Sequence, residues 1–169
     1  MKYLPLLVLF ICLNSHADTQ YRLGSGDLIK IQVFGEDDLS MEVRINDQAT
    51  ISYPFLGQIR VLDKSVLELE ADIVIGLRGD YLIQPRVTVS IEEYRPFFIT
   101  GEVENPGPYP FQPGLTLRKA VTLAGGFTER ASKTKIYTAQ GTSENNRHSI
   151  SLDDPVKPDD VITVEQSFF

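Results

Sequence analysis

Short segments in which apolar and polar residues alternate dominate this chain, and turns rich in glycine and proline separate them. Alternation with a period of two is typical of β-strands that have one buried and one exposed face. The segments predicted to be strands are residues 28–34, 41–45, 50–52, 54–61, 86–91, 97–103, 109–111, 134–140, 148–152 and 161–164. With 169 residues, the chain is expected to form β-rich structure in one or two small domains.

Helical spacing occurs in two segments. In the longer one, from residue 65 to about residue 82, Ser65 and Glu68 fit a capping box, in which each side chain bonds the other residue's backbone N–H. The apolar residues expected to face a core are Val66, Leu69, Ile73 and Leu77. A shorter helix is predicted at residues 117–123, with Thr116 as its cap. This order of elements predicts an α+β fold: a β-rich domain with one long helix, followed by a β-grasp domain, in which a mixed sheet grasps a short helix.

The first 17 residues predict secretion. A lysine precedes an apolar run at residues 4–13, and small residues stand before a cleavage site between Ala17 and Asp18. The run is shorter than the ~20 apolar residues that a membrane-spanning helix needs. Bulky residues precede Cys12, so we expect no lipid on that cysteine. Residues 1–17 are therefore predicted to be a signal peptide, with an uncleaved anchor or a buried helix as the alternative.

A change in composition near residues 92–96 marks the predicted domain boundary, which gives domains at residues 18–93 and 94–169. The formal net charge is -7, and an acidic surface repels phosphate backbones, so no nucleic-acid partner is expected. The chain has one cysteine and two histidines. That scarcity excludes zinc fingers, disulfide scaffolds and cysteine-protease chemistry.

Acidic residues occur as neighbours at 36–38, 92–93, 153–154 and 159–160. Neighbouring carboxylates in a turn do not face each other across a cleft, as the paired carboxylates of glycosidases do. His148 borders a polar loop at residues 141–147 and is expected to be a surface residue rather than a general base. The sequence has no phosphate-binding loop, nucleophile motif or metal-ligand spacing. We therefore expect no catalytic residues, no cofactor and no metal, and a protein that is not an enzyme.

Aromatic and planar polar side chains gather at the start of the second predicted domain, and both kinds of group bind sugars. Alternation points Phe97 and Ile99 toward a core, whereas Tyr94, Arg95 and Tyr109 are expected to be exposed. The candidate contacts for a partner or a glycan are Tyr94, Arg95, Glu104, Asn105 and Tyr109. A packed core that holds no sugar remains the alternative.

Two sets of motifs resemble those of the bacterial polysaccharide biosynthesis/export family, of the outer-membrane polysaccharide exporter type. YRLGSGDLIKI at 21–31, ISYPFLG at 51–57 and PRVTV at 85–89 are similar to its N-terminal export domain. ITGEVENPGPY at 99–109 and LAGGF at 123–127 resemble its soluble-ligand-binding β-grasp (SLBB) domain. Two turns depart from the family pattern, because residues 47–49 and 158–160 lack the glycine that is usual there.

The resemblance implies a non-enzymatic component of capsule or exopolysaccharide export, located in the periplasm and associated with the outer membrane through its partners. The implied partners are a homo-oligomeric ring of the chain itself, an inner-membrane polysaccharide co-polymerase, a separate outer-membrane β-barrel pore and the polysaccharide. Longer members carry a lipidated cysteine and a C-terminal pore helix, which this sequence lacks, so we expect export to use another protein's pore. The alternative is a monomeric periplasmic β-grasp module that binds a soluble glycan.

Overall fold

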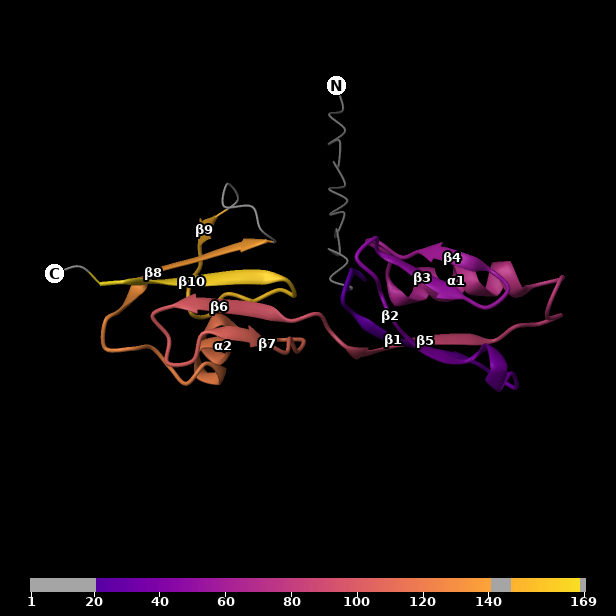
Figure 1. The fold of residues 1–169 in the computed structure, drawn as a ribbon, viewed down its shortest axis with the longest axis horizontal. Helices are drawn as coiled ribbons and strands as arrows, with labels where there is room; N and C mark the ends of the chain where they lie inside the picture. Colours follow the sequence, from indigo (N-terminus) through magenta and orange to yellow (C-terminus); the bar gives the residue numbers. More distant parts are fainter. Residues whose placement is uncertain (1–20, 141–146, 168–169) are drawn as a thin grey trace, which may run out of the picture.

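The structure, a computed structural model, describes residues 21–140 and 147–167. The predicted signal peptide, the cleavage site between Ala17 and Asp18, and residues 141–146 of the predicted polar loop lie outside the described residues. Buried hydrophobic residues form two separate clusters. We call residues 21–93 the first module, residues 94–96 the linker, and residues 97–140 with 147–167 the second module. Figure 1 shows the two modules lying end to end.

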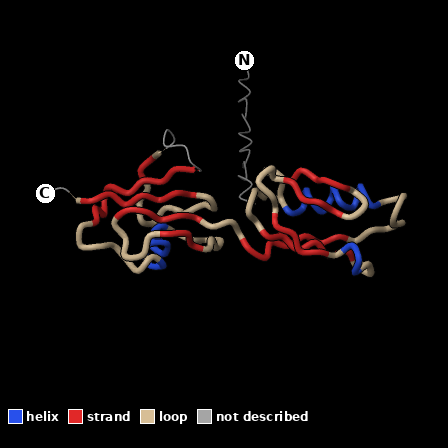
Figure 2. The backbone as a smooth tube through the Cα atoms, in the orientation of Figure 1, coloured by secondary structure: helices blue, strands red, loops and turns tan. Residues whose placement is uncertain are grey.

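The first module packs an antiparallel sheet against a hairpin and a helix, as Figures 1 and 2 show. The sheet has the strand order β2-β1-β5. Its strands are β1 (Leu28–Val33), β2 (Met41–Arg44) and β5 (Val87–Glu93). The other elements are the 3-10 helix η1 (Asp37–Leu39), the hairpin strands β3 (Thr50–Tyr53) and β4 (Gly57–Arg60), and α1 (Val66–Leu77).

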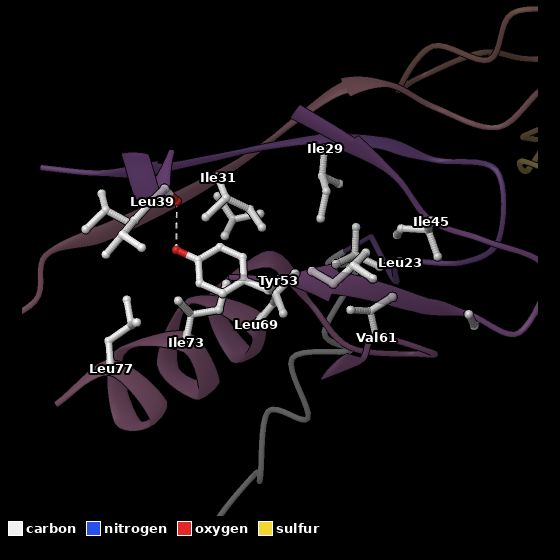
Figure 3. Packing of buried hydrophobic residues seen from close by; sticks show 14 residues of the cluster. Leu23, Ile29, Ile31, Leu39, Ile45, Tyr53, Val61, Leu69, Ile73 and Leu77 are labelled. Atoms are coloured by element: carbon white, nitrogen blue, oxygen red, sulfur yellow. Dashed lines mark hydrogen bonds between the residues drawn. The ribbon is translucent and has the colours of Figure 1, made fainter. Parts of the chain in front are cut away.

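Strand alternation and helical spacing both point residues into the first core, as predicted. The buried residues of β1 and α1 are Ile29, Ile31, Val33, Leu69, Ile73 and Leu77. Val66, the remaining residue of the predicted helical stripe, is only partly buried. Figure 3 shows the Tyr53 ring between α1 and the sheet, with its hydroxyl donating to the backbone carbonyl of Leu39 at 2.8 Å. That bond satisfies the one polar group of this buried side chain.

The capping box at the start of α1 is confirmed. The Ser65 Oγ accepts from the Glu68 N–H at 3.2 Å, and the Glu68 Oε2 accepts from the Ser65 N–H at 2.6 Å. The predicted end near residue 82 is wrong, because α1 ends at Leu77. Gly79 adopts a left-handed φ of +93° and turns the chain away from the helix.

The predicted strand at residues 54–61 is also shorter than expected. β4 covers only Gly57–Arg60, because residues 54–56 form the turn of the β3–β4 hairpin. Phe55 has a φ of +64° in this turn, and Gly57 has a φ of +70°. The proline that was expected to begin the strand therefore begins the turn instead.

The second module is a mixed sheet that packs on a short helix, which confirms the predicted α+β class. The strand order is β7-β6-β10-β8-β9, in which β10 is parallel to β6 and the other pairs are antiparallel. The strands are β6 (Phe97–Gly101), β7 (Gly107–Tyr109), β8 (Ala131–Gln140), β9 (His148–Ser149) and β10 (Asp160–Gln166). The helix α2 (Leu117–Leu123) begins after Thr116 as predicted, but the Thr116 side chain makes no capping hydrogen bond.

Three backbone positions explain local features of the sequence. β6 ends at Gly101 rather than at residue 103, because the left-handed φ of +84° at Gly101 interrupts the extended backbone. The position suits glycine, since a Cβ there would overlap the carbonyl oxygen of Val164. Ala49 and Asp159 have φ values of +54° and +68°. Both lie in the turns that lack the usual glycine, so these turns keep a left-handed residue without one.

Candidate functional site

A buried carboxylate of the first module holds the linker. Asp27, just before β1, is fully buried. Its Oδ1 accepts from the Arg95 backbone N–H at 2.8 Å, and its Oδ2 accepts from the Arg95 guanidinium at 3.0 Å. A buried ion pair is tolerated when hydrogen bonds replace the lost water. Here both oxygens of the carboxylate have such bonds.

The segment before β1 supplies further donors to the same carboxylate. The Tyr21 hydroxyl lies 2.7 and 2.9 Å from its two oxygens, and the Gly24 N–H donates to Oδ2 at 2.9 Å. The Arg95 guanidinium also donates to the Tyr21 hydroxyl oxygen at 2.8 Å. Burial and the hydrogen bond to Asp27 raise the pKa of Tyr21, so its hydroxyl stays protonated. We call Tyr21, Gly24, Asp27 and Arg95 the linker clasp.

Two glycines shape the turn beside the linker clasp, and one of them, Gly24, makes room for Arg95. A Cβ at Gly24 would lie 2.5 Å from the Nη1 of Arg95. Gly26 has a φ of +96°, a left-handed conformation that side chains disfavour. The sequence identified the glycines as turn residues, but it did not predict that Arg95 packs against this turn. No local signal links Asp27 to Arg95, since the two residues are 68 positions apart.

A groove of about 550 Å³ opens beside the linker, between the two modules. The first module lines it with Arg44 and Glu93, whose side chains form an exposed ion pair at 2.6 Å. The second module contributes Tyr109 and Phe111. Tyr94 of the linker meets the Phe111 ring edge-on, with centroids 5.5 Å apart. Aromatic surfaces beside a few polar groups are typical of binding sites.

The structure brings two of the five predicted contact residues, Tyr94 and Tyr109, to this groove. The expectation that Tyr94, Arg95 and Tyr109 are exposed is wrong, because all three are partly buried. Tyr94 packs edge-on against Tyr21 at 4.8 Å, and Tyr109 packs against Phe97 at 5.9 Å between ring centroids. The Arg95 side chain points toward Asp27 within the linker clasp, and 23% of it is exposed.

Glu104 and Asn105, the other predicted contacts, lie in the turn before β7. Their backbone N–H groups donate to the carbonyls of Gly126 and Ala124 at 3.0 and 2.9 Å, which fixes the turn against the end of α2. The Tyr109 hydroxyl donates to the Asn105 carbonyl at 2.5 Å. Glu104 and Asn105 are both exposed, and their contact with a partner stays a prediction.

The chemistry that these residues offer is hydrogen bonding and aromatic contact. Among the described residues, no group of three or more His, Cys, Asp and Glu side chains is placed to hold a metal ion. Over residues 21–140 and 147–167, we find no helix with the length and apolar character needed to cross a bilayer.

Comparisons with known proteins match both modules. Residues 15–92 match the family described as polysaccharide biosynthesis/export protein, and residues 96–151 match the SLBB domain. Exopolysaccharide production protein ExoF of Rhizobium meliloti is 31% identical over 64% of this chain, and EPS I polysaccharide export outer membrane protein EpsA of Ralstonia nicotianae is 25% identical over 73% of it. Polysialic acid transport protein KpsD of Escherichia coli is 27% identical over 72%.

The aligned segments span only part of these relatives, namely 28% of ExoF, 39% of EpsA and 22% of KpsD. The motifs that carried the predicted resemblance, at residues 21–31, 51–57 and 85–89 and at residues 99–109 and 123–127, lie within these two matched ranges. Residues 15–92 therefore form a domain of the polysaccharide biosynthesis/export protein family, and residues 96–151 form an SLBB domain.

Proposed function

We propose that this chain is a non-enzymatic, periplasmic component of a capsule or exopolysaccharide export machine. It forms or caps a translocation ring between an inner-membrane co-polymerase and a separate outer-membrane pore. The order of the two domains supports this proposal, as do relatives whose names refer to exopolysaccharide production, polysaccharide export and polysialic acid transport. The direct test is the amount of surface polysaccharide after deletion of the gene.

The observation that carries the proposal is the linker clasp. A ring closes only if every copy makes the same rotation relative to its neighbour. A two-module subunit meets that condition when its linker is fixed, and here the fully buried Asp27 fixes the start of the linker through Arg95. A monomeric sugar-binding module has no need of such a fixed linker.

Surfaces at both modules suit the addition of further copies or partners. The outer strands of the two larger sheets are β2 and β5 in the first module, and β7 and β9 in the second. Open strand edges are sites at which another chain adds. The exposed turn at residues 104–106 stands directly before the edge strand β7. We place one contact of the ring at this turn.

Crosslinking in intact cells tests the assembly. A cysteine at Glu104 should give a ladder of homo-oligomers and adducts with membrane proteins. The same cysteine combined with Asp27→Asn should give a weaker ladder, whereas its combination with Glu93→Gln, outside the linker clasp, should not. A pattern of monomers in all three strains would contradict the ring.

The groove favours a second candidate function, a monomeric periplasmic module that binds a soluble glycan. Its aromatic residues and its Arg44–Glu93 ion pair are groups that contact sugars. Sedimentation of the purified protein, with and without oligosaccharide, separates the two functions. A single monomeric species that binds oligosaccharide without self-associating would favour the second function.

A further inference from the structure

Exposed apolar side chains are concentrated in the first module. It holds seven of the nine large hydrophobic residues that are exposed in the described part of the chain. Two of them, Leu67 and Ile75, lie on α1 and are 59% and 70% exposed. Ala71, which is also exposed, lies four positions from each, so the three residues share one side of the helix. We call Leu67, Ala71 and Ile75 the α1 ridge.

The α1 ridge faces away from the core of its own module. The buried residues of α1 follow the ridge residues by two positions, which is about 200° around the helix. Surface helices usually carry polar residues on their outer side, and contiguous exposed apolar residues mark interaction sites. The first module has thirteen acidic and seven basic side chains, so an anionic lipid surface repels it. The α1 ridge therefore suits a protein partner.

The sheet of the second module offers a matching surface. In the part of the chain that the structure describes, this module has the single helix α2, which packs on the core face of the sheet. On the opposite face, the strand registers place four apolar residues side by side across β7, β6, β10 and β8. These residues, which we call the apolar row, are Pro108, Phe98, Val161 and Ala139. All four are at least partly exposed.

The apolar row differs from the outer face of the other sheet. In the first module, the residues on that face are polar, namely Lys30, Gln32, Glu42, Thr88 and Ser90. Polar residues are usual where one side of an antiparallel sheet faces water. A helix with an apolar side that packs on the apolar row would give the second sheet a helix on both faces, a common layer arrangement.

Charge favours a contact between different modules of two copies. Two first modules repel each other, because each has an excess of acidic side chains. β8 carries Lys133 and Lys135 and no acidic residue, and alternation places both lysines on the face that bears Ala139. The acidic first module of one copy is therefore attracted to this face of another copy.

We propose that the α1 ridge of one copy packs on the apolar row of the next copy. The inference rests on the proposed function, since it names a contact that joins copies of the ring. Two different surfaces meet, so each copy has one neighbour on either side, as a ring requires. The apolar row begins at Pro108, two residues after the turn at residues 104–106, where we place a contact of the ring. The two contacts form one continuous surface.

Disulfide formation between two copies in intact cells of the host tests the proposal. Both copies carry Cys12→Ser. One copy also carries Ala71→Cys and a longer tag, and the other carries Ala139→Cys. We expect a mixed disulfide dimer when both are present and none when either is expressed alone. In the control, Ser90→Cys, on the polar face of the first module's sheet, replaces Ala71→Cys and should give no mixed dimer.

A second variant tests the apolar character of the contact. Ile75→Asp should lower the yield of mixed dimer at least about fivefold, because it places a charge in an apolar interface. Ile83→Asp is the matched control, since Ile83 is 88% exposed and lies outside the α1 ridge; it should leave the yield unchanged. Urea unfolding should give the same midpoint for both variants, which separates the loss of contact from a loss of folding.

Three outcomes would overturn the proposal: no mixed dimer above the Ser90→Cys control, a dimer from Ala71→Cys alone, or equal yields for Ile75→Asp and Ile83→Asp. The surface polysaccharide of a deletion strain keeps this test apart from the proposed function. If deletion abolishes the polymer and the mixed dimer is absent, only the contact proposal fails. If deletion leaves the polymer unchanged and the mixed dimer forms, only the export proposal fails.

Discussion

Asp27 and Arg95 are 68 positions apart in the sequence, yet the Asp27 carboxylate accepts hydrogen bonds from both the backbone and the guanidinium of Arg95. Asp27 precedes the first strand of one module, and Arg95 lies in the linker to the other. Because Asp27 is fully buried, the loss of this partner would leave its carboxylate poorly compensated. The pair therefore couples the stability of the first module to the position of the linker.

Replacing Asp27 tests that coupling. Asp27→Asn should lower the free energy of unfolding by about 3 kcal/mol, because it leaves a partly buried guanidinium without its counter-charge. Glu93→Gln is the control, since it removes an ion pair whose side chains are 53% and 62% exposed; we expect a change within about 0.5 kcal/mol. Urea unfolding measures both. Matching midpoints for the two variants would show that the linker clasp does not hold the linker.

Asp160→Asn should stabilise the protein at pH 7 and lose this advantage at low pH. Burial raises the folded-state pKa of Asp160 above the ordinary value of 3.8. The folded protein therefore binds a proton at Asp160 more tightly than the unfolded chain does. The stability that this protonation contributes is fully present below pH 3.8 and is lost as the pH rises through the folded-state pKa. Asparagine resembles the protonated form at every pH. Denaturant unfolding of wild type and variant at several pH values measures the difference.

The exposed Asp38 of η1 provides the control for this pH series. Asp38→Asn should show no comparable gain at pH 7, because its carboxyl is not buried. A difference between wild type and Asp160→Asn that does not change with pH would contradict the role assigned to burial.

Ser65→Ala should destabilise the protein by about 0.5–2 kcal/mol, because the Glu68 N–H at the start of α1 loses its acceptor. Ser52→Ala, at an exposed strand position, should change stability far less. Thermal or urea unfolding measures both variants. An unchanged midpoint for Ser65→Ala would mean that the capping box contributes nothing to α1.

Asp159→Gly should stabilise the protein by about 0.5–1 kcal/mol, because glycine adopts a left-handed φ without steric cost. Ala49→Gly should gain less, since it also removes a buried methyl group. The control is Lys133→Gly, at an exposed position within β8, where glycine should destabilise by a similar amount. If Asp159→Gly lowers the unfolding midpoint as Lys133→Gly does, the left-handed turn is not strained.

The features that sequence reasoning predicted correctly are local ones. The Ser65–Glu68 capping box spans three residues, and the β1 core residues follow from alternation alone. The end of α1 was misplaced because the predicted helix was extended to about residue 82, past Leu77, the last residue of its apolar stripe. The left-handed φ of Gly79 ends the helix at that stripe instead.

The candidate site was only partly predictable, because its contacts are long-range. Aromatic clustering indicated Tyr94 and Tyr109, and both line the groove. The role of Arg95 was missed, since its partner Asp27 belongs to a turn of the first module that is distant in the sequence. The burial of Asp160 was missed as well, because it depends on the pairing of β10 with β6 and β8 in the second module.

Surface polysaccharide in a deletion strain is the most direct measurement of the proposed role. We predict that deletion abolishes the polymer at the cell surface and that wild type and Glu93→Gln restore it. Asp27→Asn, compared at equal protein level, should restore much less, because its linker is no longer fixed. Normal surface polysaccharide in the deletion strain would contradict a role in export, and full rescue by Asp27→Asn would contradict the need for the linker clasp.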